Sequence, residues 1–112
     1  MKKVIYNIKN ERGNNVANQF LMIEGTDYTF TSYQTTIAIL KAGSGVIFLN
    51  ESVFDYSRTT TRHFLNYLEN VLTAEKPTRK QVESWIKSGH IPSSENCYNT
   101  DITIKLVNEE DF

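Results

Sequence analysis

The sequence is poor in the residues from which disulfides and metal sites are built. It has one cysteine, Cys97, and two histidines, His63 and His90. A single cysteine excludes an internal disulfide and a zinc site with several cysteine ligands. The two histidines are far apart in the chain and match no metal-binding motif. We therefore expect no metal and no cofactor.

Long apolar runs are also missing. No segment approaches the ~18 consecutive apolar residues that a membrane-spanning helix requires. The segment "MKKVIYNIKN" begins with basic residues but lacks the apolar centre of a signal peptide. We expect a soluble cytoplasmic protein with no membrane partner.

Neither sign of charge is in clear excess over the whole chain, but the charges are unevenly distributed along it. The net charge of the 112 residues is −1, which argues against a strongly basic nucleic-acid binder. Residues 58–94 nevertheless carry six basic and three acidic residues, whereas residues 95–112 carry one basic and five acidic residues. Either a solvated helical surface is followed by a polar tail, or one of these regions faces a partner.

The length suits one compact domain over residues 1–112, with residues 108–112 as a frayed acidic tail. The first half of the chain has the pattern of short strands joined by turns. Alternating apolar and polar residues, or short apolar runs, predict strands at 3–8, 16–23, 28–33, 35–41 and 46–49. Such a series is typical of an antiparallel meander. Segment 101–107 alternates again and could return to an edge of the sheet.

The apolar spacing becomes helical in the second half. From Phe64 to Leu72, apolar residues recur as in an amphipathic helix. Thr78 and Gln81 have the spacing of a capping box at the start of a second helix. Trp85 belongs to the buried face of that helix, and Gly89 suits its C-terminal end. The predicted fold class is α+β, an antiparallel meander sheet of four to six strands with two helices packed on one face.

The segment "RTTTRH" (58–63) most resembles a functional site. A threonine ahead of a helix can satisfy its free N–H groups, so helix capping by one of the three threonines is one interpretation. The alternative is an anion site, in which Arg58 and Arg62 reinforce the positive end of the helix. Catalysis by His63 would need a partner such as Asp55, and no pattern brings the two together. We expect no enzymatic activity.

Three segments, "GNNVANQFLM" (13–22), "SYQTTIA" (32–38) and "FDYSRTT" (54–60), and the later "IKSGHI" (86–91), resemble a family of small domains carried by phages and plasmids of low-GC Gram-positive bacteria. Members show an Asn-x-x-Ala-Asn-Gln start, a Ser-Tyr-x-x-x-Ile-Ala strand and a Trp/Phe-Asp-Tyr-Ser-x-Thr-Thr segment followed by a helix. The corresponding residues are Asn14, Ala17, Asn18, Gln19, Ser32, Tyr33, Ile37, Ala38, Phe54, Asp55, Tyr56, Ser57, Thr59 and Thr60.

The resemblance implies no activity, but it implies an accessory gene of a mobile element. Small phage proteins without catalytic signatures are often inhibitors of host defence, including anti-CRISPR proteins. We therefore predict a non-enzymatic accessory protein that binds and inhibits a host protein in the bacterial cytoplasm, most concretely a CRISPR effector nuclease. The alternative is a small nucleic-acid-binding module that uses the helix start at Arg58 and Arg62 together with the basic second helix, which carries Arg79, Lys80 and Lys87.

The predicted contacts follow from charge and aromatic character. Tyr33 could stack on a base, and the acidic end could imitate nucleic-acid phosphates in a basic groove. A homodimer through a sheet edge, at 46–49 or 101–107, is also open. The candidate partner-binding residues are Tyr33, Tyr56, Arg58, Arg62, His63, Glu109, Glu110 and Asp111.

Overall fold

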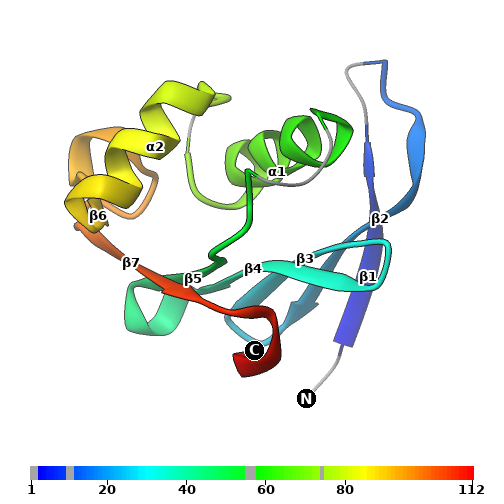
Figure 1. Cartoon of the computed structure of the whole chain (residues 1–112), viewed down its shortest axis with the longest axis horizontal. Helices are drawn as coiled ribbons and strands as arrows, with labels where there is room; N and C mark the ends of the chain where they lie inside the picture. Colours follow the sequence, from blue (N-terminus) through cyan, green and yellow to red (C-terminus); the bar gives the residue numbers. More distant parts are fainter. Residues whose placement is uncertain (1–2, 10–11, 55–57, 74) are drawn as a thin grey trace.

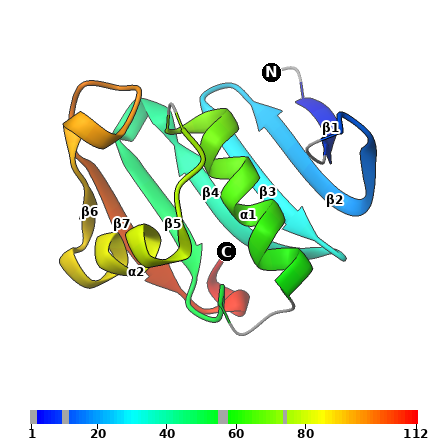
Figure 2. The ribbon, with the colours of Figure 1, turned by 90° about the horizontal axis from the view of Figure 1, so that it is seen from above.

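The fold is a seven-stranded sheet with two helices packed over one face (Figures 1 and 2). The structure, a computed structural model, describes residues 3–9, 12–54, 58–73 and 75–112. Figure 2 shows α1 lying across the middle strands and α2 beside it, over the end of the sheet that holds β5, β7 and β6. The elements are β1 (Lys3–Lys9), β2 (Asn15–Glu24), β3 (Asp27–Ser32), β4 (Thr35–Lys41), β5 (Val46–Asn50), α1 (Arg58–Val71), α2 (Arg79–Ser88), β6 (His90–Ile91) and β7 (Ile102–Val107).

The strands lie in the order β1-β2-β3-β4-β5-β7-β6. Consecutive strands from β1 to β5 pair antiparallel, which confirms the predicted meander and the α+β class. The sheet has one strand more than predicted because His90 and Ile91 pair with the start of β7. The pairing of β5 with β7 is parallel, since the chain crosses over through both helices between them.

The expectation of a sheet edge is wrong for segment 46–49 but holds for most of segment 101–107. Segment 46–49 lies in β5, which has β4 on one side and β7 on the other, so it offers no free edge. β7 is covered by β6 along only its first two residues. The opposite edge is β1, where the exposed Lys3 and Lys9 disfavour pairing with another strand.

The core lies between the sheet and α1, and an aromatic cluster forms its centre. The ring of Tyr67 stacks against Phe30 and Phe64, with centroid distances of 5.5 and 6.3 Å. All three side chains are fully buried. The Tyr67 hydroxyl donates to the backbone oxygen of Tyr28 at 2.6 Å, so its burial leaves no unpaired hydroxyl. Burial raises the pKa of Tyr67.

The second helix begins and ends as its sequence predicts. The Thr78 side chain accepts from the Gln81 N–H at 3.1 Å, and the Gln81 side chain accepts from the Thr78 N–H at 2.9 Å. The capping box is therefore confirmed. Gly89 follows the helix with a φ of +86°, and its N–H donates to the Trp85 carbonyl at 2.8 Å. Trp85 is 5% exposed and belongs to the core, as expected.

The C-terminal segment forms a short 3-10 turn, η3 (Glu109–Asp111), in the stretch expected to fray. The Asn108 side chain caps it by accepting from the Glu110 N–H at 3.0 Å. Figure 1 shows this turn on the side of the sheet away from the helices. Within the described residues, neither helix is long and apolar enough to cross a membrane.

Candidate functional site

The first helix begins earlier than its apolar stripe suggests. α1 starts at Arg58, six positions before Phe64, so the three threonines lie inside its first turns. The capping role predicted for them is therefore wrong. Thr60 instead faces the sheet, where it is 4% exposed and its hydroxyl lies 3.2 Å from the hydroxyl of Ser32 on β3. This buried polar contact fixes the start of α1 over the end of β3.

His63 lies on the same buried side of α1. It is 0% exposed and therefore has no accessible surface for a partner. The predicted contact role of His63 is wrong. The reason is helical spacing: His63 follows Thr60 by three positions and therefore faces the sheet with it. The predicted residues Asp55 and Tyr56 lie outside the described residues.

The opposite side of the helix start carries the charged residues. Arg58, Arg62 and Leu65 are spaced four and three positions apart, so they share one face of α1. Together with Thr61, and with Arg79 from the first turn of α2, they line a surface hollow of about 270 Å³. We call this set the arginine hollow. Three arginines from two helices thus line one hollow together with a leucine and a threonine.

Arg79 is held in place by the edge of the core. Its guanidinium carbon lies 4.7 Å from the centroid of the Phe54 ring, a cation–π contact. The Phe54 ring in turn packs edge-on against Phe64, with centroids 6.4 Å apart. The Nε of Arg79 donates to Glu83 at 2.7 Å, one turn further along α2. Both contacts limit the rotamers of Arg79 and fix its position beside α1.

The arginine hollow has an excess of positive charge. The ion pair with Glu83 offsets Arg79, whereas within the part of the chain that the structure describes no carboxylate pairs with the exposed Arg58 or Arg62. The N-terminal end of α1 adds the positive end of the helix dipole. A guanidinium group presents its N–H donors in a planar fork that matches a carboxylate or a phosphate. The arrangement is therefore suited to binding an anionic group.

The arginine hollow is lined by basic, hydroxyl and apolar side chains. Its lining contains arginine, threonine and leucine side chains. Among residues 3–9, 12–54, 58–73 and 75–112, no group of three or more His, Cys, Asp or Glu residues could hold a metal ion.

The other predicted residues fall into two places. Tyr33 is 64% exposed and follows Ser32, so it lies at the same end of α1 as Arg58. Glu109 and Glu110 line a separate hollow with Glu51, on the far side of the sheet. Neither Tyr33 nor the acidic end belongs to the lining of the arginine hollow.

Sequence reasoning grouped Arg79 with Arg58 and Arg62 by charge, in the nucleic-acid alternative, but it missed Leu65 as a member of the site. Arg79 belongs to the basic second helix in the sequence, and Leu65 belongs to the apolar stripe of α1. Only the packing of α2 beside α1 brings them together, and no local pattern signals that contact.

Comparison with known proteins shows the family. The chain belongs to the family of unknown function DUF8033, whose model matches residues 3–84. That range includes the whole arginine hollow. No curated protein and no solved structure matches the chain.

Proposed function

We propose that this member of the DUF8033 family is a non-enzymatic binding protein that uses the arginine hollow to hold an acidic surface of another protein. The observation that carries this proposal is the convergence of Arg58, Arg62 and Arg79 from two helices, with one carboxylate to offset them. An aspartate or glutamate side chain of the partner would pair with Arg58 and Arg62 in the fork geometry of guanidinium–carboxylate pairs.

The composition of the hollow favours a protein partner. Arginine is enriched in protein interfaces and in the few residues that dominate their binding energy. Leu65 gives the hollow an apolar floor, which an apolar side chain beside the partner's carboxylate would cover. A partner that covers Leu65 also excludes water from the ion pairs, which strengthens them.

The resemblance to phage- and plasmid-borne domains supports a host protein as the partner. We propose a bacterial cytoplasmic target, with a CRISPR effector nuclease as the most concrete case and inhibition as the consequence. Such nucleases hold nucleic acid in positively charged channels. The separate acidic hollow of Glu51, Glu109 and Glu110 would then contact a basic channel while the arginine hollow contacts an acidic surface beside it.

Retention of a host protein on the immobilised chain tests the main proposal. The double variant Arg58→Glu/Arg62→Glu reverses the charge of the hollow, and acidic residues suit the start of a helix, so α1 should keep its stability. We expect this variant to lose the host protein that the wild type retains from a bacterial lysate.

The matched control is Lys9→Glu/Lys105→Glu, which changes the net charge equally at two exposed strand residues. It should retain the same host protein as the wild type. Equal retention by both double variants, or no retained protein in several hosts, would contradict the proposal. For a retained nuclease, DNA cleavage in the presence and absence of the chain measures inhibition.

Nucleic acid is the second candidate partner, because the first turns of both helices place arginines around one hollow. Lys80 adds a further exposed cation beside Arg79. Phosphate binding would make the affinity fall with salt, with a slope of about −0.9 in log affinity for each phosphate neutralised on duplex DNA. A mobility-shift assay at low salt that gives no complex with DNA or RNA eliminates this candidate.

A further inference from the structure

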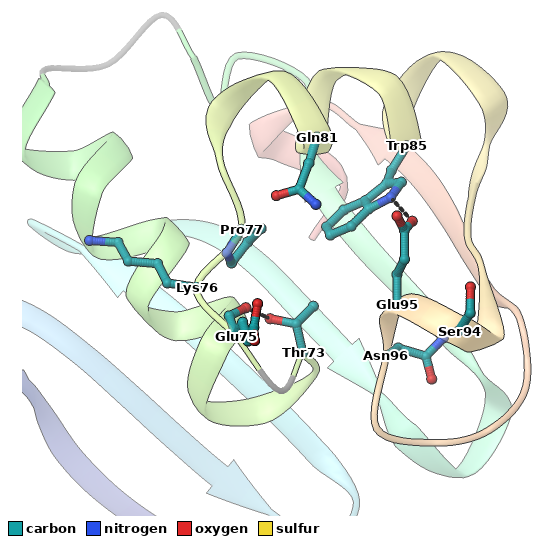
Figure 3. A pocket seen from close by; sticks show the side chains of 9 residues that line it. All are labelled: Thr73, Glu75, Lys76, Pro77, Gln81, Trp85, Ser94, Glu95 and Asn96. Atoms are coloured by element: carbon teal, nitrogen blue, oxygen red, sulfur yellow. Dashed lines mark hydrogen bonds between the residues drawn. The ribbon is translucent and has the colours of Figure 1, made fainter.

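The hollow drawn in Figure 3 is built around a core contact. It lies between α2 and the short 3-10 turn η2 (Ser93–Glu95), where the Trp85 indole Nε1 donates to the Glu95 carboxylate at 2.7 Å. Trp85 is 5% exposed, so its ring packs into the core and the contact serves to hold η2 against α2. At the opposite edge of the sheet, a hollow beside β1 is open to a ligand.

This second hollow, of about 490 Å³, runs along the edge of β1. Five consecutive residues of the strand, 5–9, line it, so it follows the strand instead of lying on one face of the sheet. Asn15 and Leu21 on β2 and Asn70 on α1 complete the lining. We call it the β1 groove.

The outer edge of β1 has backbone groups available for pairing. Within the described residues, β1 is the last strand of the sheet and pairs with β2 alone. Alternate residues of such an edge strand direct their N–H and C=O groups away from the sheet, where an added strand can pair with them. The template is the seven-residue strand Lys3–Lys9.

Two large apolar side chains of β1 are exposed beside this edge. Ile5 is 59% exposed and Tyr6 is 53% exposed. The two residues are neighbours in the strand, so their side chains point to opposite faces of the sheet. An added strand also alternates its side chains between the two faces, so it would cover both Ile5 and Tyr6.

The charge of the groove favours an acidic strand. Lys9 is exposed and lines the groove, and within the described part of the chain no carboxylate pairs with it. Lys3, at the other end of β1, lies 3.8 Å from Glu24. A lysine at a sheet edge works against an uncharged strand, but it pairs with a carboxylate of an acidic one.

A second copy of the chain is a poor occupant of this edge. Antiparallel pairing of two β1 strands over their full length centres on Tyr6 and places Lys3 opposite Lys9. Like charges directly opposite each other destabilise a strand pair. The edge is therefore suited to a different polypeptide.

The hairpin that carries the groove is held in shape by a side chain. The Asn7 side chain donates to the Val16 carbonyl at 3.1 Å, which ties β1 to β2. This bond lies where the strand register shifts, between Asn7 and Lys9. A preformed template lowers the ordering cost that a ligand must overcome.

We propose that the β1 groove binds an extended acidic segment of a protein partner, which joins the seven-stranded sheet as a further strand beside β1. Its backbone pairs with the edge of β1, its apolar side chains cover Ile5 and Tyr6, and a carboxylate pairs with Lys9. The β1 groove and the arginine hollow share no lining residue, so this inference does not rest on the proposed function.

The probe is a fluorescein-labelled peptide of nine residues, with aspartate at both ends and alternating valine and threonine between them. Fluorescence anisotropy follows its titration with the full chain, and we expect a dissociation constant on the order of 100 μM. The same peptide with lysine at both ends should bind about tenfold more weakly, because it meets Lys9 with a like charge.

Two N-methylated forms of the acidic peptide test the strand pairing itself. Each carries methyl groups on alternate amides, and only one of the two sets faces β1 in an added strand. One form should therefore lose binding while the other keeps it. In the complex, alternate amides of β1 should exchange their hydrogens about tenfold more slowly at a peptide concentration ten times the dissociation constant.

The variant Lys9→Thr tests the charge of the groove. Threonine suits a strand, and we expect the peptide to bind about fivefold more weakly, the effect of losing one ion pair near 4 Å in water. The matched control is Lys105→Thr, which removes an exposed lysine from β7 and should leave binding unchanged. If Lys9→Thr does not fold, as judged by circular dichroism, the lysine-ended peptide tests the charge on the wild type.

Saturable binding of the acidic peptide that one N-methylated form loses supports the proposal. Equal effects of the two N-methylated forms overturn it, as does the absence of saturable binding. Weakening by Lys105→Thr instead of Lys9→Thr would assign the peptide to β7 and also overturn it.

Two variants separate this inference from the proposed function. Arg58→Glu/Arg62→Glu should bind the peptide as the wild type does. Lys9→Glu/Lys105→Glu should bind the peptide much more weakly while it still retains the host protein. Failure of the β1 groove is therefore distinct from failure of the arginine hollow.

Discussion

Replacing Tyr67 by phenylalanine removes one hydroxyl group from the centre of the core. The ring stacks between Phe30 and Phe64, and phenylalanine preserves that packing. The hydroxyl donates to the Tyr28 carbonyl at 2.6 Å, and the variant leaves that buried oxygen without this donor. We expect Tyr67→Phe to lower the free energy of unfolding by about 1.5 kcal/mol at pH 7.

The difference in the free energy of unfolding between the wild type and Tyr67→Phe should depend on pH. Burial raises the pKa of Tyr67 above its ordinary value of 10.0, so the folded protein keeps this phenol protonated where the unfolded chain loses the proton. Above pH 10 the unfolded state binds fewer protons, so stability that is intact below pH 10 is lost as the pH rises. The loss is about 1.4 kcal/mol for one pH unit. Since Tyr67→Phe lacks this loss, its deficit should close by about pH 11.

Urea denaturation followed by circular dichroism, at pH 7 and at pH 11, measures both quantities. The other titratable groups are present in both proteins, so their own contributions cancel to first order in the difference. Tyr33→Phe is the control, because this tyrosine is 64% exposed and should change stability by less than about 0.5 kcal/mol at either pH. A Tyr67→Phe deficit of the same size at pH 7 and pH 11 would refute the reasoning.

Three further substitutions test local features. Thr78→Ala removes half of the capping box and should cost about 1 kcal/mol in thermal unfolding, whereas an unchanged melting temperature would contradict the cap. Gly89→Ala should cost about 1 kcal/mol in urea denaturation. No heavy atom lies within 4 Å of the added carbon, so backbone strain at a φ of +86° is the cause, and an equally stable variant would contradict it. Asp27→Asn breaks the half-buried pair with Lys41, 3.0 Å apart, and should cost less than about 1 kcal/mol. A loss that persists in high salt would show that more than this ion pair is involved.

The strands of the meander could be predicted because their signal is local. In segment 35–41, β-branched and apolar residues predict a strand, and β4 spans the same residues. The start of α1 could not be predicted in this way, because Thr60 and His63 are polar residues on the buried face of the helix. Ser32 supplies Thr60 with a partner across the interface, so an apolar stripe gives the wrong start.

The arginines of the candidate site could be predicted from their charge, but the packing that brings them together could not. Arg58 and Arg62 are neighbours on one helix, and their spacing in the sequence identifies them. Arg79 joins them through its contact with Phe54, which precedes α1 and lies 25 positions away in the chain. The Trp85–Glu95 bond likewise depends on how η2 folds back onto α2. Such contacts depend on tertiary packing, and periodicity contains no information about them.

The parallel pairing of β5 with β7 has a consequence for biosynthesis. Val46 pairs with Thr103, which is synthesised 57 residues later. One side of β5 therefore stays unpaired until β7 has been made. Until then a nascent chain exposes the backbone amides and carbonyls of Val46–Asn50, an apolar stretch that another polypeptide could pair with. Chaperones that shield this stretch should therefore be needed most while the two helices are being translated.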